Sequence, residues 1–277
     1  MGNERAKRRG GTAMSEPVVL TEQRGRTLLI TINRVKASNC INADVHQLIG
    51  QALEHAEREP EIRAGVLTGA GERVFCAGAD LKALGTQGGE GVLPADTKHW
   101  GFAGMVDHPI GVPIIAAVQG SALGGGTELA LASDLIVAAD TASFGLPEVH
   151  RGLMAAAGGV FRLTESLPKH IALELILTGE PMPAADALRW GFVNRVVPQT
   201  QVLDAALELA DKVAACAPVA VQASKRVARG IIDGSTPAER DAWALSEAEM
   251  AKVTSSADVA EGIGAFIEKR QPLWQGR

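Results

Sequence analysis

Short runs of apolar residues alternate along the first two thirds of the chain with longer stretches of mixed polarity. The runs at 28–32, 64–68, 113–118 and 134–138 are short and rich in β-branched or small apolar residues, which predicts buried strands. Residues 42–56 begin with polar side chains and then place apolar ones at helical spacing, which predicts a helix. Because parallel neighbouring strands need long crossover connections, the alternation predicts an α/β class with helices over a largely parallel sheet.

The pattern changes at about residue 200, where strand-like runs stop. Four helix-like stretches follow one another at 202–216, 218–232, 237–253 and 257–269. We therefore expect an α/β core at 14–200 and a helical C-terminal subdomain at 201–277.

Composition and charge narrow the class of protein. The chain has 277 residues, 46% of them apolar, which is enough for one substantial core with an appended subdomain. No apolar run approaches the roughly 20 residues of a membrane-spanning helix, so no membrane partner is expected. Residues 1–13 carry four basic side chains and one acidic one without the apolar segment of a secretory signal, and we interpret them as a disordered basic tail. The net charge of −5 argues against nonspecific nucleic-acid binding.

The cysteines and histidines predict neither a disulfide framework nor a metal site. Cys40, Cys76 and Cys216 show no paired spacing, and with no signal sequence this indicates a reducing cytoplasm. The six histidines lack metal-ligand spacing.

Three glycines followed by a glutamate form the most informative segment, at 119–130. They lie between a buried strand and an apolar helix-like run, and the glutamate is Glu128. Glycines at a helix start leave backbone N–H groups accessible where partial positive charge accumulates, which favours an anion or oxyanion receptor. The alternative is a tight turn that needs only a positive φ.

A second segment, 74–82, follows the second buried strand. Its small residues at 77–79 would let a ligand approach the backbone closely, and Lys82 could meet a phosphate. Asp80 in this segment is the residue type of a helix cap rather than a catalyst, and Cys76 that of a packed small hydrophobe.

A third segment, 143–148, ends in Glu148. This glutamate stands between Pro147 and Val149, where it would be poorly hydrated. Loss of hydration raises the proton affinity of a carboxylate toward the range that suits acid/base catalysis. A surface glutamate that only aids solubility is the alternative.

Together these segments resemble the crotonase superfamily, the enoyl-CoA hydratase/isomerase family, from about Val18 to the C-terminus. Four stretches carry the resemblance: Asn33-Arg34 with Asn39 and Asn42, then Phe75–Lys82, Gly124–Leu129 and Gly179–Val197. The resemblance implies a crotonase-like spiral core of ββα units with the C-terminal helical subdomain, involved in forming a homotrimer or homohexamer.

The resemblance also implies roles for particular residues. The backbone N–H groups of Ala79 and Gly125 would form an oxyanion hole for a thioester carbonyl, with Glu128 and Glu148 as the acid/base pair. Five further residues would contact the CoA moiety, the last two often from a neighbouring subunit: Ala77, Leu81, Lys82, Phe266 and Lys269. Coenzyme A would enter as part of an acyl-CoA substrate, so no separate cofactor is expected.

The expected activity is that of an enoyl-CoA hydratase, which adds water across the double bond of trans-2-enoyl-CoA thioesters, as in β-oxidation. An isomerase would need only one carboxylate, and other crotonase-type thioester chemistry stays open because function resides in the site rather than the fold. A noncatalytic acyl-CoA or RNA-binding protein is a further alternative. Two positions depart from the family pattern: Val35 replaces a proline, and Ala156 replaces a glycine that helps seat the catalytic water in hydratases.

Overall fold

The computed structural model describes residues 16–277, so the tail predicted at 1–13 lies outside the described residues. The strands are β1 Val19–Arg24, β2 Thr27–Ile32, β3 Ala64–Gly69, β4 Val74–Cys76, β5 Ile114–Val118, β6 Ser121–Leu123, β7 Leu135–Ala139, β8 Ser143–Gly145, β9 Met182–Pro183 and β10 Arg195–Val197. The α-helices are α1 Ala43–Arg58, α2 Leu81–Gln87, α3 Gly125–Ala132, α4 Gly159–Ser166, α5 Lys169–Thr178, α6 Ala184–Arg189, α7 Val202–Ala214, α8 Pro218–Arg229, α9 Arg240–Thr254 and α10 Ala257–Glu268.

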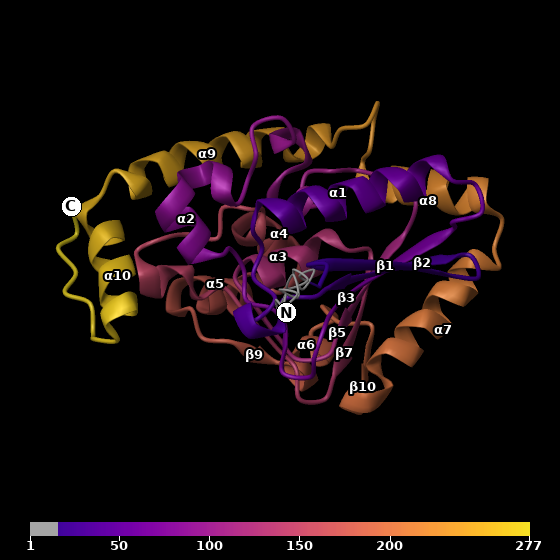
Figure 1. Ribbon diagram of the computed structural model, residues 1–277, viewed down its shortest axis with the longest axis horizontal. Helices are drawn as coiled ribbons and strands as arrows, with labels where there is room; N and C mark the ends of the chain where they lie inside the picture. Colours follow the sequence, from indigo (N-terminus) through magenta and orange to yellow (C-terminus); the bar gives the residue numbers. More distant parts are fainter. Residues whose placement is uncertain (1–15) are drawn as a thin grey trace, which may run out of the picture.

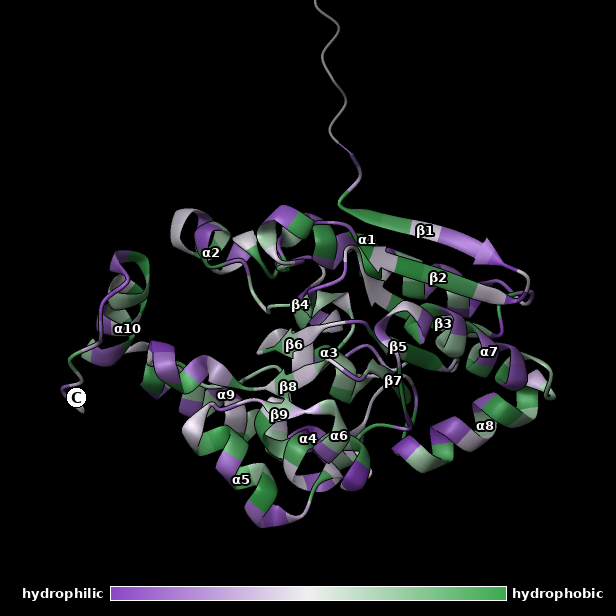
Figure 2. Cartoon of the chain, turned by 90° about the horizontal axis from the view of Figure 1, so that it is seen from below, coloured by the Kyte–Doolittle hydropathy of each residue, from purple (hydrophilic) through white to green (hydrophobic). Residues whose placement is uncertain are grey.

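A six-stranded sheet in the order β1-β2-β3-β5-β7-β10 forms the centre of the molecule. Every neighbouring pair is parallel except β1 and β2. Strands β3 and β5 are buried along their whole length, whereas β1 exposes all but its first residue, and Figure 2 shows β1 turning from hydrophobic to hydrophilic along its length. Helices α1 and α7 lie on opposite sides of this sheet (Figure 1). The predicted α/β class is confirmed.

A second sheet of short strands, β4-β6-β8-β9, lies beside the first. Successive strands enter the two sheets in turn, and a helix follows each pair: β3-β4-α2, then β5-β6-α3, then β7-β8-α4. This repetition is the predicted spiral of ββα units. Because each unit ends its second strand at the same small sheet, the loops after β4, β6 and β8 meet in one place.

Four helices follow residue 200, as predicted, at α7, α8, α9 and α10. Helix α7 packs on β3, β5 and β7, so it covers the sheet, while α10 packs on the 3-10 helix η5, Pro147–Arg151. Helix α8 buries none of its residues. The boundary at 200/201 and the role of 201–277 in oligomerisation stay predictions.

None of the helices within residues 16–277 combines the length and the apolar character that crossing a membrane would require.

Candidate active site

Helix α3 begins at the end of β6 and presents the N–H group of Gly125. The chain enters the helix through Gly124, whose φ of +56° is a conformation that favours glycine. The helix has no room for larger residues at its start: a Cβ on Gly125 would lie 2.6 Å from Phe102 Cζ, and one on Gly126 2.8 Å from the carbonyl carbon of Cys76. As the first residue of a helix, Gly125 has no intrahelical partner for its N–H.

The loop after β4 brings Ala79 to the same place. Gly78 has a φ of +90°, and a Cβ on it would lie 3.0 Å from the nitrogen of Gly125. The Ile41 N–H donates to the Gly78 carbonyl (2.9 Å) and the Asp80 N–H to the Ile41 carbonyl (2.8 Å), which fixes the loop. Within residues 16–277, the N–H groups of Ala79 and Gly125 find no protein acceptor. Two free donors therefore lie side by side at the start of α3.

Asp80 is the N-cap of α2, as predicted, rather than a catalytic group. Its Oδ1 accepts from the N–H groups of Lys82 (3.1 Å) and Ala83 (3.3 Å), and its Oδ2 pairs with the Arg34 guanidinium at 2.9 Å. These contacts outweigh burial and hold the pKa of Asp80 below its ordinary value. Cys76 is fully buried, and burial raises the pKa of its thiol to about 12, which agrees with a packing role.

Glu128 lies one turn into α3 and is 3% exposed. Its Oε1 accepts hydrogen bonds from the N–H groups of Ala157 (2.8 Å) and Gly159 (2.9 Å) at the start of α4. Burial is the largest influence on this carboxyl and raises its pKa, and the nearby Glu148 raises it further, against the opposing effect of the two N–H donors.

Glu148 enters from η5, beyond β8. A Cβ on Gly124 would lie 2.7 Å from its Oε1, so this carboxyl abuts the turn that presents Gly125. Its Oε2 is buried and has no hydrogen-bond partner among residues 16–277, and burial raises the pKa of the carboxyl. A buried oxygen without a partner is costly, and it indicates a position where a bound water or ligand supplies the missing hydrogen bond.

The five residues expected to contact CoA fall into two groups. Ala77, Leu81 and Lys82 lie in or just after the Ala79 loop, with Lys82 exposed at the start of α2. Phe266 and Lys269 lie at the end of α10 and line a cavity together with residues 149–151, next to Glu148. The Arg151 guanidinium stacks on Phe266 at 4.3 Å from the ring centroid. Helices α2 and α10 lie toward the same end of the molecule (Figure 1).

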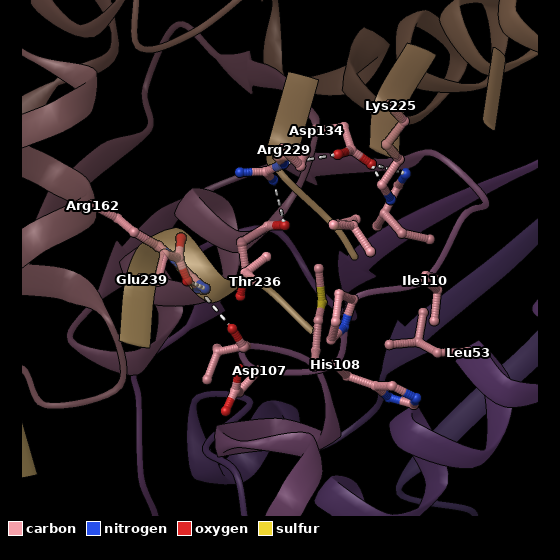
Figure 3. A pocket seen from close by; sticks show the side chains of 16 residues that line it. Leu53, Asp107, His108, Ile110, Asp134, Arg162, Lys225, Arg229, Thr236 and Glu239 are labelled. Carbon is pink, nitrogen blue, oxygen red and sulfur yellow. Dashed lines mark hydrogen bonds and ion pairs between the residues drawn. The ribbon is translucent and has the colours of Figure 1, made fainter. Parts of the chain in front are cut away.

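A separate cavity lies at the far end of α3, beyond Ala132 (Figure 3). Five of its charged side chains form ion pairs: Asp134 with Lys225 at 2.7 Å and with Arg229 at 3.2 Å, and Glu239 with Arg162 at 2.6 Å. These pairs join α8 and the start of α9 to β7 and α4. The cavity therefore contains a structural ion-pair network that anchors the C-terminal helices.

Sequence reasoning missed the N–H donors that hold Glu128 and the position of Phe102. The donors are backbone groups of Ala157 and Gly159, so no side chain marks them. At Ala156, the departure from the family pattern, the carbonyl accepts from Ser246 at 3.4 Å. From the sequence alone, Phe102 could line an acyl tunnel or pack in the core. In the structure it contacts the Gly125 position directly, because it stands in a tight turn rather than an α-helix.

The chain is similar to known proteins over most of its length. The model of the family described as enoyl-CoA hydratase/isomerase matches residues 22–277. A protein of Proteus mirabilis named carnitinyl-CoA dehydratase is 44% identical over 270 residues, covering 95% of this chain and all of that protein. A crystal structure of carnitinyl-CoA hydratase from Mycobacterium avium shares 54% identity with a TM-score of 0.92, covering 95% of this chain and all of that one. The enoyl-CoA hydratase of Mycobacterium tuberculosis H37Rv shares 44% identity over the same fractions, with a TM-score of 0.73.

Proposed function

The chain belongs to the enoyl-CoA hydratase/isomerase family, and from this premise we propose that it catalyses the reversible addition of water to 2-enoyl-CoA thioesters. The observation that carries the proposal is the meeting of two free N–H groups with two buried carboxyl groups of raised pKa. Because several relatives are named for carnitinyl-CoA, we propose this 3-hydroxyacyl thioester as the first substrate to test, in the direction of water loss.

The N–H groups of Ala79 and Gly125 would bind the thioester oxygen. Addition of water moves electron density onto that oxygen, and donors aimed at it stabilise the enolate-like transition state. Loss of one such donor typically costs a factor of about 10² to 10³ in rate. Since both donors are main-chain groups on anchored segments, they need no reorganisation when the charge develops.

The two carboxyl groups would share one proton. In hydration, ionised Glu128 takes a proton from the water that attacks C3, and protonated Glu148 gives a proton to C2. Hydrogen bonding supports this division, because two N–H donors stabilise negative charge on Glu128 whereas Glu148 Oε2 has no partner within residues 16–277. Burial acts against it, because it raises the pKa of Glu128, to about 8, more than that of Glu148, to about 7. Dehydration runs the same steps in reverse: ionised Glu148 takes the C2 proton and protonated Glu128 donates to the leaving hydroxyl.

The presence of both carboxyl groups favours this reaction over isomerisation, which moves a single proton between two carbons. CoA would be held by the two groups of residues on either side, with Lys82 and Lys269 as the cationic members. In this proposal coenzyme A belongs to the substrate, and no further cofactor takes part.

The test is to measure crotonyl-CoA hydration and carnitinyl-CoA dehydration with Glu128→Gln and Glu148→Gln. Each variant should lose at least about 100-fold in kcat, because proton transfer by a positioned side chain contributes 10² to 10⁴. Glu165→Gln, on the exposed side of α4, is the matched control and should keep wild-type turnover. Near wild-type turnover in both site variants would refute the mechanism, and a product with a shifted double bond would indicate an isomerase.

A further inference from the structure

Hydrogen bonds at Thr97, Gly104 and His108 join the segment 97–108 to helix α1. The Gly104 N–H donates to His46 Nδ1 on α1 at 3.0 Å. The Gly104 carbonyl lies 2.9 Å from His108 Nδ1, and His108 Nε2 lies 3.0 Å from Glu54 Oε1, also on α1. Acceptors therefore face both nitrogens of His108, whereas His46 must itself accept a hydrogen bond.

His46 can make its hydrogen bonds only as a neutral ring. It is fully buried, and with Nδ1 accepting from Gly104, its proton lies on Nε2 and points to Thr97 Oγ1 at 3.0 Å. Burial lowers the pKa of His46; the titratable groups around it are Asp96, His99 and His108, of which the acid favours protonation and the histidines oppose it. Protonation would set an N–H against the Gly104 N–H, and the bond would be lost.

The segment fits against α1 so closely that its backbone shape is fixed. A Cβ on Gly104 would lie 2.7 Å from the nitrogen of Gly50, and a Cβ on Gly50 would lie 2.5 Å from Trp100 Cζ3. Gly101, Ala103 and Gly104 all have positive φ, between +57° and +67°. A left-handed alanine is uncommon and persists only when its surroundings determine it.

This turn carries Phe102 to the oxyanion glycine. The ring of Phe102 occupies the space beside Gly125 where a Cβ would stand, at 2.6 Å from that position to Cζ. A thioester whose oxygen is bound by the Gly125 N–H would place its acyl chain next to this ring. The hydrogen bond between His46 and Gly104 therefore helps to hold Phe102, two residues away, in place beside the acyl chain.

We propose that His46 is a positioning residue for the reaction, which holds segment 97–108 on α1 and so keeps Phe102 as the wall that selects short acyl chains. The inference rests on the proposed function, because it takes Gly125 as the donor to the thioester oxygen. It adds to that function a residue that does not touch the substrate and a physical limit on acyl length.

Three variants separate this role from a merely structural one. His46→Asn keeps an acceptor at the position of Nδ1 but cannot be protonated, His46→Phe removes both hydrogen bonds, and Phe102→Ala removes the wall. His55→Asn, on the exposed side of α1, is the matched control. For each variant, kcat and KM are measured from pH 5 to 8. The substrates are 2-enoyl-CoA thioesters whose acyl chains have about four to twelve carbons.

In the wild type, KM for the short substrate should rise toward acid pH as His46 becomes protonated, and in His46→Asn this rise should be absent. His46→Phe should raise that KM about tenfold at every pH, which corresponds to about 1.4 kcal/mol, because the buried Gly104 N–H loses its acceptor. Its kcat should change less. Both His46→Phe and Phe102→Ala should shift the preference toward longer chains.

An unchanged chain-length preference in His46→Phe and Phe102→Ala, or an acid rise of KM that persists in His46→Asn, would overturn the inference while leaving the proposed function intact. If His46→Phe fails to fold by circular dichroism, the pH profile of His46→Asn and the preference of Phe102→Ala still decide. A wild type that converts none of the thioesters would refute the proposed function and this inference with it.

Discussion

Replacement of Gly125 by alanine tests the proposed oxyanion donor and its packing together. The new methyl group would lie 2.6 Å from Phe102 Cζ and 3.2 Å from Gly78 Cα. Carbon atoms prefer a separation of about 3.5 Å or more, so the ring or the helix start must move by about 1 Å. The backbone φ of Gly125 is not in the left-handed region, so the substitution keeps the N–H and adds no torsional strain.

Two costs follow from that displacement. Overpacking a rigid site destabilises a protein by about 1–3 kcal/mol. A displaced N–H loses part of its aim at the thioester oxygen, and complete loss of one donor costs about 10² to 10³ in rate. We expect kcat/KM for crotonyl-CoA to fall by about 100-fold while the protein stays folded at 25 °C.

The assay is steady-state hydration followed by absorbance, with urea unfolding to measure the change in stability. Gly264→Ala in α10, where a Cβ meets nothing within 4 Å, is the control for adding a methyl group to a helical glycine. Combining Gly125→Ala with Phe102→Ala should restore part of kcat/KM relative to Gly125→Ala alone, because the clash is removed. Wild-type activity in Gly125→Ala would refute the proposed donor, and no recovery in the double variant would refute the contact with Phe102.

Two further outcomes concern stability. Asp134→Ala leaves Lys225 without its carboxylate partner and removes the acceptor of the Ile114 N–H, so unfolding in urea should show a loss of about 3–5 kcal/mol; a loss below 1 kcal/mol would contradict a structural role for the network. Burial raises the pKa values of Glu128 and Glu148 above that of a free glutamate, so the folded state binds more protons, and the free energy of unfolding should fall as pH rises from about 4.5 through the folded pKa values. The double Glu→Gln variant should show a flatter dependence between pH 5 and 9, and an equal slope in both proteins would count against buried, proton-holding carboxyls.

The parts of the fold that follow from local pattern could be predicted from the sequence. The four apolar runs became β2, β3, β5 and β7, because strands buried on both faces need continuous apolar residues. Helix α1 starts at its predicted cap, where the Asn42 side chain accepts from the Val45 N–H at 3.1 Å. The exposed strand β1 escaped prediction because its alternation is weak and it relies on pairing with β2.

Prediction from the sequence was less complete for residues 85–105. Glycines and a proline in Gly85–Pro94 are typical of a mobile surface loop, yet α2 continues through Gln87 and a 3-10 turn follows. Trp100, Phe102 and Met105 stand at a spacing typical of the buried face of a helix. Positive φ at Gly101, Ala103 and Gly104 gives a turn instead. These conformations depend on contacts with α1 that lie some 50 residues away in sequence, so no local pattern encodes them.

The candidate site, too, could be predicted from the sequence only in part. The glycines and glutamates could be identified as chemical groups, and the structure brings Glu128, Glu148, Ala79 and Gly125 together; their roles stay proposals. What the sequence could not supply is the asymmetry between the carboxyl groups, since it arises from N–H donors of Ala157 and Gly159 that reach Glu128 across a tertiary contact.

The position of Glu128 on the same buried helix as Gly125 has a practical consequence for protein engineering. In the proposed mechanism the group that polarises the carbonyl belongs to the main chain, whereas the groups that move protons are the side chains at 128 and 148. An engineer can therefore exchange the proton carriers, singly or together, while the activated thioester stays where it was. New reactions on this scaffold should be sought first by varying those two positions, before any loop is rebuilt.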